Sequence, residues 1–425
     1  MKILIINYRY FVSGGPERYL FNLKSLLEKK GNTVIPFSIN YSKNEYTEYQ
    51  KYFVSPLSGS DEIYFKDQSW TLNSFLKTME RTFYSREVFN NLCRLIDNEK
   101  PDFAIVLAYL RKLSPSVLVA LNLKRIPFTV RLSDFSMVCP NAHLIRGNDV
   151  CELCLHGSLF NSVRYKCVQN SFMVSLVNYL SVKYHNLRKY FDLIQCFIVP
   201  SIFTKNKLID GGIDDKRIEH VPTFIYPEVF QEKVNKKNQL IYVGRVERIK
   251  GVHLLLHACG ILKQDYNIEG YPVIIAGNGN KKYLDELKEI VNRYALSEVR
   301  FVGNLEKNDL FKMIRESLIS VAPSLWYDNS PNSVLESLAC GTAVIVPRHG
   351  SFLEMNKENE TGLFFKPNDP YDLAVKIKYL MENPNESSSM GEKGIKYIEQ
   401  FHSPDFHYHR LMEIYSRLKD QKVKN

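Results

Sequence analysis

The sequence lacks any long apolar run. Its most apolar later stretch, residues 172–180, is interrupted by polar side chains and falls well short of the roughly 20 residues that a transmembrane helix needs. Near the start of the chain only four apolar residues lie between Lys2 and Asn7, too few for the apolar region of a signal peptide. We therefore expect a buried first strand, no membrane-spanning helix and a cytoplasmic protein.

Motifs of two large protein classes are also missing. The loop at Gly14 and Gly15 does not continue into the pattern G-x-G-x-x-G, so the sequence gives little support to a nicotinamide enzyme. No helix-turn-helix or RNP-like signature accompanies the formal net charge of +10. That charge favours anionic partners, and without such a signature phosphorylated small molecules or an anionic membrane surface are better candidates than nucleic acid.

Length and composition indicate an ordinary globular protein with two domains. The 425 residues are 45% hydrophobic and 24% charged, and a chain of this length can bury two separate cores. Eight cysteines without an export signal favour a reducing compartment over a disulfide framework.

The first half of the sequence alternates short apolar runs with helical or irregular segments. Strands are expected at residues 2–7, 33–39, 102–107, 127–131 and 192–200, and helices at 16–30 and 72–95. The strand at 192–200 is expected to be the last one of this half. This pattern predicts a parallel sheet with helices on its faces. We assign residues 1–225 to a first domain, and the polar segment at 224–238 to a linker.

The second half repeats this pattern. Strands are expected at residues 239–243, 272–276, 299–302, 318–322, 343–346 and 362–365, and helices at 332–339, 370–381 and 387–400. Residues 239–400 would form a second domain of the same class. A last helix, within residues 401–425, is expected to cross back onto the first domain.

A loop of the second half places two carboxylates near a helix start. Asp328 lies in the loop and Glu336 in the helix 332–339, with seven residues between them. The N–H groups of Asn332 and Ser333 in the first helical turn have no partner within the helix, so they attract a phosphate. Earlier in the domain, Arg245 stands in a glycine-bounded loop that leads into another helix start.

These features resemble the family 4 glycosyltransferases, which are retaining enzymes of the GT-B fold with an E-x7-E motif. The resemblance runs from residue 2 to about residue 415, and Asp328 stands where the family usually has Glu. It implies two Rossmann-like domains that face a central cleft, of which residues 1–225 would bind the acceptor and residues 239–400 the nucleotide sugar. It also implies transfer of a sugar from a nucleotide diphosphate sugar, with UDP or GDP expected, to a saccharide or lipid-linked saccharide, without a catalytic metal.

The resemblance also implies roles for individual residues. Arg245 and Lys250 would hold the diphosphate, Glu336 the ribose hydroxyls and Asp328 a hydroxyl of the donor sugar. Where the family usually has His-Asp, this chain has Ser133 and Asp134, which favours a different donor sugar. The remaining positions expected at the donor are Gly14, Gly15, Asp134, Gly244, Gly277, Gly303, Asn304, Leu305, Asn332 and Ser333.

Four of the cysteines fall within a short stretch. Cys139, Cys151, Cys154 and Cys167 have the spacing C-x11-C-x2-C-x12-C, which suits a tetrahedral thiolate site for a structural zinc. Four thiolates would leave no open position for chemistry. Separately packed free cysteines are the alternative.

Two further questions stay open at the level of sequence. The segment 172–191, with Lys183, Arg188 and Lys189 near its end, could pack on the sheet or lie on an anionic membrane surface, which would make the protein peripheral on the inner face. The expected acceptor is a bacterial capsule, O-antigen or exopolysaccharide. A sugar-nucleotide-binding scaffold without turnover is the alternative, since Ser133 and Asp328 both depart from the family pattern.

Overall fold

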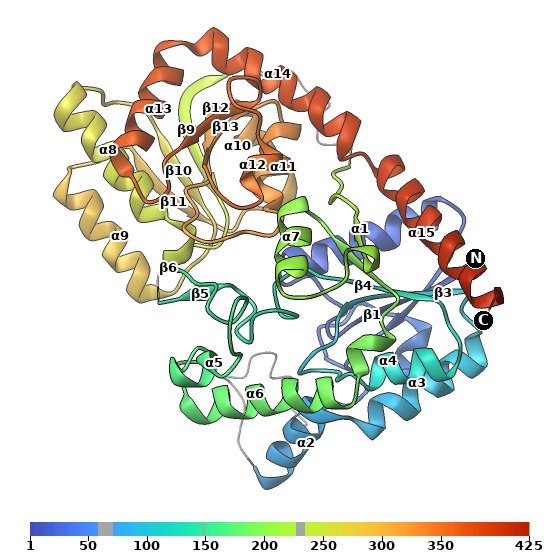
Figure 1. Cartoon of the computed structure of the whole chain (residues 1–425). Helices are drawn as coiled ribbons and strands as arrows, with labels where there is room; N and C mark the ends of the chain where they lie inside the picture. Colours follow the sequence, from blue (N-terminus) through green and yellow to red (C-terminus); the bar gives the residue numbers. More distant parts are fainter. Residues whose placement is uncertain (58–70, 148, 227–233, 425) are drawn as a thin grey trace.

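The computed structural model describes residues 1–57, 71–147, 149–226 and 234–424. Its long strands form two six-stranded sheets, one from each half of the chain (Figure 1). A small antiparallel pair, β5 (Ile145–Arg146) with β6 (Asp149–Val150), stands apart from them. The two large sheets are parallel, as the sequence predicts for doubly wound α/β domains.

The first sheet has the strand order β2-β1-β3-β4-β7-β8. Side chains from alternate positions of its central strands enter different cores: Leu4 and Val106 belong to one buried cluster, Ile3 and Ile105 to another. Because both faces of the sheet are buried, the strands read as continuous apolar runs. The strands are β1 (Lys2–Asn7), β2 (Thr33–Phe37), β3 (Phe103–Ala108), β4 (Phe128–Arg131), β7 (Cys196–Val199) and β8 (Ile218–His220).

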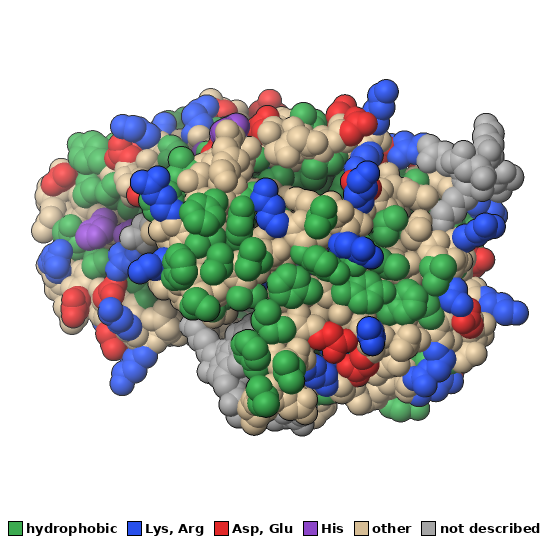
Figure 2. Space-filling model, turned by 60° about the horizontal axis from the view of Figure 1, so that its bottom comes forward, with side chains coloured by type: hydrophobic (Ala, Val, Ile, Leu, Met, Phe, Trp, Pro, Cys, Tyr) green, Lys and Arg blue, Asp and Glu red, His purple; other side chains and the backbone are tan. Residues whose placement is uncertain are grey.

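The helices of the first half pack around this sheet. Two of them, α2 and α6, lie against each other on the underside of Figure 1. Hydrophobic side chains gather across that underside (Figure 2). The helices are α1 (Gly15–Lys29), α2 (Leu72–Phe83), α3 (Arg86–Glu99), α4 (Ser116–Leu123), α5 (Asn161–Arg164), α6 (Phe172–Leu187) and α7 (Ile202–Asp210).

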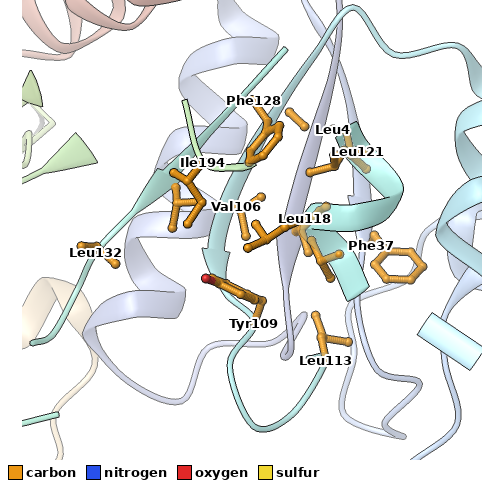
Figure 3. Packing of buried hydrophobic residues seen from close by; sticks show 14 of the residues in the cluster. Leu4, Phe37, Val106, Tyr109, Leu113, Leu118, Leu121, Phe128, Leu132 and Ile194 are labelled. Atoms are coloured by element: carbon orange, nitrogen blue, oxygen red, sulfur yellow. The ribbon is translucent and has the colours of Figure 1, made fainter. Parts of the chain in front are cut away.

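The largest core of the first half lies between its sheet and helices α3 and α4. Leu118 and Leu121 of α4 lie against Leu4 and Val106 of the two central strands (Figure 3). All four side chains are fully buried. This packing fixes the direction of β1 and β3, and therefore the positions of the loops at their carboxyl ends.

The second sheet has the strand order β11-β10-β9-β12-β13-β14. Its strands are β9 (Lys237–Val243), β10 (Val273–Ala276), β11 (Val299–Gly303), β12 (Ser317–Val321), β13 (Ala343–Pro347) and β14 (Gly362–Phe365). Its helices are α8 (Val252–Tyr266), α9 (Lys281–Arg293), α10 (Lys307–Glu316), α11 (Asn332–Ala339), α12 (Phe352–Met355), α13 (Pro370–Glu382) and α14 (Pro384–Phe401).

The last helix, α15 (Pro404–Lys424), packs on the first sheet rather than the second. Its side chains Leu411, Ile414 and Leu418 are buried in the cluster that holds Ile3 and Phe103. The start of the helix is tied to the first half by an ion pair of 2.5 Å between Lys30 and Asp405. The chain therefore closes on its own beginning (Figure 1).

Three sequence expectations about elements differ from the structure. The single helix expected at residues 72–95 is broken into α2 and α3, because the Ser85 hydroxyl accepts a hydrogen bond from the Val88 N–H and starts a new helix. Residues 192–200 do not hold the last strand of the first sheet, since β8 follows. The proposed linker, 224–238, lies partly outside the described residues, and β9 begins within it at Lys237.

We predict that Leu118→Ala lowers the free energy of unfolding of the first domain by about 2–5 kcal/mol, since it leaves a cavity in a fully buried site. Leu123→Ala is the matched control, because Leu123 ends the same helix with 61% of its surface exposed. Urea denaturation followed by tryptophan fluorescence and circular dichroism measures both. Equal losses for the two variants would contradict the packing described here.

Candidate functional site

A cavity of about 1360 Å³ separates the two halves and is lined by both. It collects loops from the carboxyl ends of strands in each sheet, where open parallel sheets bind ligands. All of the donor-site residues expected from sequence line it: Gly14, Gly15, Asp134, Gly244, Arg245, Lys250, Gly277, Gly303, Asn304, Leu305, Asp328, Asn332, Ser333 and Glu336. Their individual roles stay predictions, but the fold brings them to one place.

Two glycines bring the loops of the second half into contact. Gly251 has φ +73°, and a Cβ there would lie 1.8 Å from the Pro323 carbonyl oxygen. Gly277 has φ +140°, and its Cβ would lie 1.8 Å from the Gly244 carbonyl oxygen. A side chain at either position would force the loops apart. The Arg245–Lys250 loop is thereby held against the loop that carries Asp328.

Lys250 and Asp328 form the best-defined ion pair of the cavity. The Lys250 ammonium lies 2.5 Å from Asp328 Oδ1, and the Ser324 hydroxyl donates to Asp328 Oδ2 over 2.9 Å. Asp328 is 7% exposed, and the Lys250 ammonium also stands 5.0 Å from the centre of the Trp326 ring. Lysine has three N–H donors, so Lys250 can keep Asp328 and still donate to a ligand.

Arg245 behaves differently from Lys250. Its side chain is 61% exposed and pairs with Glu247 over 2.9 Å. An exposed pair of this kind is weak, so the guanidinium can be drawn to a stronger anion at little cost. Sequence reasoning placed Arg245 at the cavity but did not foresee Glu247 as its partner.

Glu336 is buried and faces the other half of the molecule. It is 6% exposed, and burial raises the pKa of its carboxyl, an effect opposed by the charges of Arg18 and Lys307. The Arg18 guanidinium, on α1, reaches across the cleft to Glu336 at 3.4 Å. Sequence reasoning missed Arg18, because only the fold brings residues so far apart in the chain together.

The N-terminal ends of two helices meet at the cavity. Helix α1 follows Gly14 and helix α11 follows Pro331, and neither start has a side-chain cap. A Cβ on Gly15 would lie 3.7 Å from Nδ2 of the Asn332 side chain. Free N–H groups and the positive ends of two helix dipoles therefore face the same space, which suits an anion.

Ser133 and Asp134 lie at the floor of the cleft. The Ser133 hydroxyl accepts a hydrogen bond of 2.9 Å from the Arg131 guanidinium, and an Asp134 oxygen accepts one of 2.9 Å from the Ser136 N–H. Arg131 is 4% exposed, stacks 3.7 Å from the centre of the Tyr19 ring and donates to the Thr223 hydroxyl. Ser133 is thus already bound to a buried cation.

The structure describes the four clustered cysteines without a metal-ligand arrangement. All are free thiols, and burial together with the charges of the other three raises the pKa of Cys154 to about 12. Among the residues that the structure describes, no three Cys, His, Asp or Glu side chains stand together in a way that could hold a metal ion. The side-chain positions therefore give the structural zinc no support, and it stays a prediction from spacing.

Residues 228–397 match the family model described as glycosyl transferases group 1. These residues are a group 1 glycosyltransferase domain. An uncharacterized glycosyltransferase of Methanocaldococcus jannaschii is 23% identical over 228 residues, which are 52% of this chain and 56% of the relative. Glycogen synthase of Mycobacterium tuberculosis is 30% identical over 147 residues, 34% of each chain. The chain thus spans about half of the first relative and a third of the second.

Solved structures extend the likeness to the whole chain. Sucrose-phosphate synthase of Thermosynechococcus elongatus superposes with a TM-score of 0.72 at 17% identity, over 99% of both chains. Anabaena HepE in complex with UDP superposes with a TM-score of 0.65 at 15% identity, over 98% of this chain and all of its own. At these identities the likeness concerns the fold. The chain has the GT-B fold, with the group 1 domain as its second half.

We predict that Lys250→Met lowers the affinity for nucleoside diphosphates about 10- to 100-fold, because it removes a charge-assisted donor from the group 1 domain. Isothermal titration calorimetry measures this affinity, and circular dichroism verifies that the variant is folded. Arg248→Met is the matched control: Arg248 belongs to the same short turn, Arg248–Lys250, but pairs with Glu286 outside the cavity lining. Unchanged affinity in Lys250→Met would show that this lysine does not face the diphosphate.

Proposed function

We propose that the protein is a retaining glycosyltransferase of the family 4 type, which moves a sugar from a nucleotide diphosphate sugar to a hydroxyl acceptor. One observation carries the proposal. Within a single cleft the structure gathers two uncapped helix starts, the paired Lys250 and Asp328, and the buried Glu336. The group 1 domain and the GT-B fold both support a role of this arrangement in glycosyl transfer.

The geometry suits departure of a diphosphate. Negative charge grows on the leaving group as the glycosidic bond breaks, and donors that already point there stabilise it. Lys250, Arg245 and the N–H groups of Asn332 and Ser333 can supply those donors without a metal ion. Glu336 would accept the ribose hydroxyls and Asp328 a hydroxyl of the sugar, so neither needs to act as a base.

UDP is the favoured nucleotide in this proposal. The structure of Anabaena HepE was determined with UDP, with UDP and glucose, and with UDP-glucose. Each of these superposes over at least 98% of the present chain. GDP stays the second candidate, because the described cavity lining does not by itself name the base.

The deciding experiment first measures thermal stabilisation by UDP, GDP, ADP and dTDP, and then follows the corresponding nucleotide sugars by proton NMR. We expect UDP to stabilise the protein most, and the anomeric signal of the new product to match that of the donor. Inversion of the anomeric configuration would overturn retention. Nucleotide binding without any consumption of donor sugar would contradict catalysis and favour a sugar-nucleotide-binding scaffold.

For the acceptor we propose a lipid-linked saccharide of surface polysaccharide assembly, met at an anionic membrane face. None of the helices in the described part of the chain has the length and apolar content of a membrane crossing. Along α6, Met173, Leu180 and Leu187 recur every seven residues and are 64%, 48% and 80% exposed, so they lie on one side of the helix. Leu72 and Leu76 of the neighbouring α2 are 77% and 58% exposed.

The charge around this apolar surface favours an anionic membrane as its partner. Between Glu152 and Asp192 the sequence has no acidic residue but five basic ones: Arg164, Lys166, Lys183, Arg188 and Lys189. Hydrophobic side chains form a broad band on this face, with lysine and arginine side chains among and beside them (Figure 2). Apolar side chains bordered by cations match the surface of an anionic bilayer.

We predict that the protein floats with vesicles of anionic phospholipid at low salt, and that Leu180→Glu/Leu187→Glu abolishes most of this binding because it removes apolar contacts and adds repulsion. Density-gradient flotation measures it. Leu353→Glu is the matched control, since Leu353 is 53% exposed on α12 of the second domain. Protein that stays in the soluble fraction, or a double variant that floats as well as the control, would contradict the membrane proposal.

A further inference from the structure

The loop that carries Asp328 also bonds to the first half of the chain. The side chain of the next residue, Asn329, lies between the two halves. Its amide nitrogen donates to the Leu132 carbonyl over 3.1 Å. Its amide oxygen accepts hydrogen bonds from the hydroxyl of Thr204 and, over 3.5 Å, from that of Ser201, both at the start of α7. One side chain therefore bonds to two separate segments of the first half.

The two hydroxyls that bond to Asn329 are removed from solvent. Thr204 is 0% exposed and Ser201 is 1% exposed, and their oxygens lie 2.8 Å apart. Without Asn329 one hydroxyl could still donate to the other, but the second would lose its acceptor. A buried donor without an acceptor is costly. The start of α7 therefore stabilises the position in which Asn329 is bound.

Asp328, by contrast, is held by the second half. Its carboxylate accepts from Lys250 and Ser324, and its backbone carbonyl accepts from the Ser351 hydroxyl over 2.7 Å. These three partners belong to the second half, whereas those of Asn329 belong to the first. Consecutive Cα atoms are only about 3.8 Å apart. The two halves therefore cannot separate here unless one of the two sets of bonds breaks.

The residues that flank this pair contact the first half as well. The centre of the Tyr327 ring lies 4.7 Å from that of Phe203. The Ser330 hydroxyl donates to the Thr223 hydroxyl over 3.2 Å. The loop therefore lies against the first half on both sides of Asp328.

The two sets of bonds differ in strength. The bond between Lys250 and Asp328 joins two charged groups, and hydrogen bonds of this kind are roughly twice as strong as neutral ones. The bonds of the Asn329 amide are neutral. If the halves move apart, we therefore expect the bonds of Asn329 to break first, while Asp328 stays with Lys250.

Asn329 also fixes the spacing between residues that line the cavity from opposite halves. Leu132, which accepts its amide N–H, is followed directly by Ser133 and Asp134. Asp134 lines the cavity from the first half and Asp328 lines it from the second. A hydrogen bond between the neighbours of these two carboxylates therefore sets the width of the space between them.

We propose that Asn329 is a positioning residue, whose amide couples closure of the two halves to the placement of Asp328 relative to Asp134. This inference rests on the proposed function, because it places the donor sugar between these two carboxylates. The nucleotide is bound through Arg245 and Lys250 of the second half, which need no such coupling. Loss of the amide should therefore affect sugar transfer more than nucleotide binding.

Asn329→Ala tests this proposal. We expect it to leave the affinity for UDP unchanged in isothermal titration calorimetry. The turnover number for the UDP-sugar that the unmodified protein consumes should fall about 10- to 100-fold in proton NMR, because a displacement of about 1 Å can cost this much. Small-angle X-ray scattering of the UDP-bound variant should show a larger radius of gyration. Asn292→Ala is the control, since Asn292 is exposed on α9 outside the cavity lining.

A double variant shows whether Asn329 acts through the first half. Thr204→Val removes the hydroxyl that donates to Asn329 and keeps the shape of the side chain. If the two residues act together, Asn329→Ala/Thr204→Val loses no more turnover than Asn329→Ala alone. Losses that multiply would contradict the coupling through α7. Circular dichroism verifies that each variant is folded.

The outcomes separate this inference from the proposed function. Unchanged turnover together with an unchanged radius of gyration in Asn329→Ala would overturn it. Equal losses of UDP affinity and turnover would also overturn it, because they would assign Asn329 to nucleotide binding or to general stability. An unmodified protein that binds UDP but consumes no nucleotide sugar would instead count against the proposed function, and the radius of gyration would still test the coupling.

Discussion

The contact between Gly251 and the Pro323 carbonyl holds the donor side of the cleft together. No side chain fits between these two loops, and their approach sets Lys250 beside Asp328. Without it Lys250 would be one more solvated lysine on a basic protein, and Asp328 a buried carboxylate without its cation, which is strongly destabilising. This one backbone contact thus brings the loop of Lys250 and the loop of Asp328 together at one site.

Three cations on the donor side of the cleft are each paired with a carboxylate. Lys250 pairs with Asp328, Arg245 with Glu247 and Arg18 with Glu336. A weakly charged ligand would gain little by competing with these carboxylates. A diphosphate carries more charge and more acceptor oxygens than a carboxylate, so it can draw Arg245 from an exposed pair and share Lys250. Selectivity follows from this competition as much as from shape.

The two halves also meet at a second place. Glu354 accepts hydrogen bonds of 2.7 and 2.8 Å from the N–H groups of Ile202 and Phe203 at the start of α7. Near the crossing to α15, His402 and His407 bond to the Thr223 and Pro222 carbonyls. Burial lowers the pKa of these histidines to about 4 and about 3, so they are neutral links near pH 7.

Helices and strands were predicted best where proline or glycine marks their ends. Helix α11 and strand β14 have the expected bounds, because proline and glycine border the apolar runs. The three-residue strand β8 was not predicted, because the sequence of so short a strand does not differ from that of a loop. Arg18 was not predicted either, because its contact with Glu336 joins residues that are distant in the chain. The metal site predicted from cysteine spacing stays a prediction, because spacing does not fix where the thiols point.

Arg131 supplies a fixed positive charge to the cleft. It is buried at the floor of the cleft and, within the described residues, no ion pair links it to a carboxylate. It is held by the Tyr19 ring and by the Ser133 and Thr223 hydroxyls, and its charge is therefore not cancelled. A fixed cation in a site of low dielectric strengthens the attraction of the cleft for an anionic ligand. On this argument Ser133 serves to hold that cation in place, which an imidazole at the same position would not do in the same way.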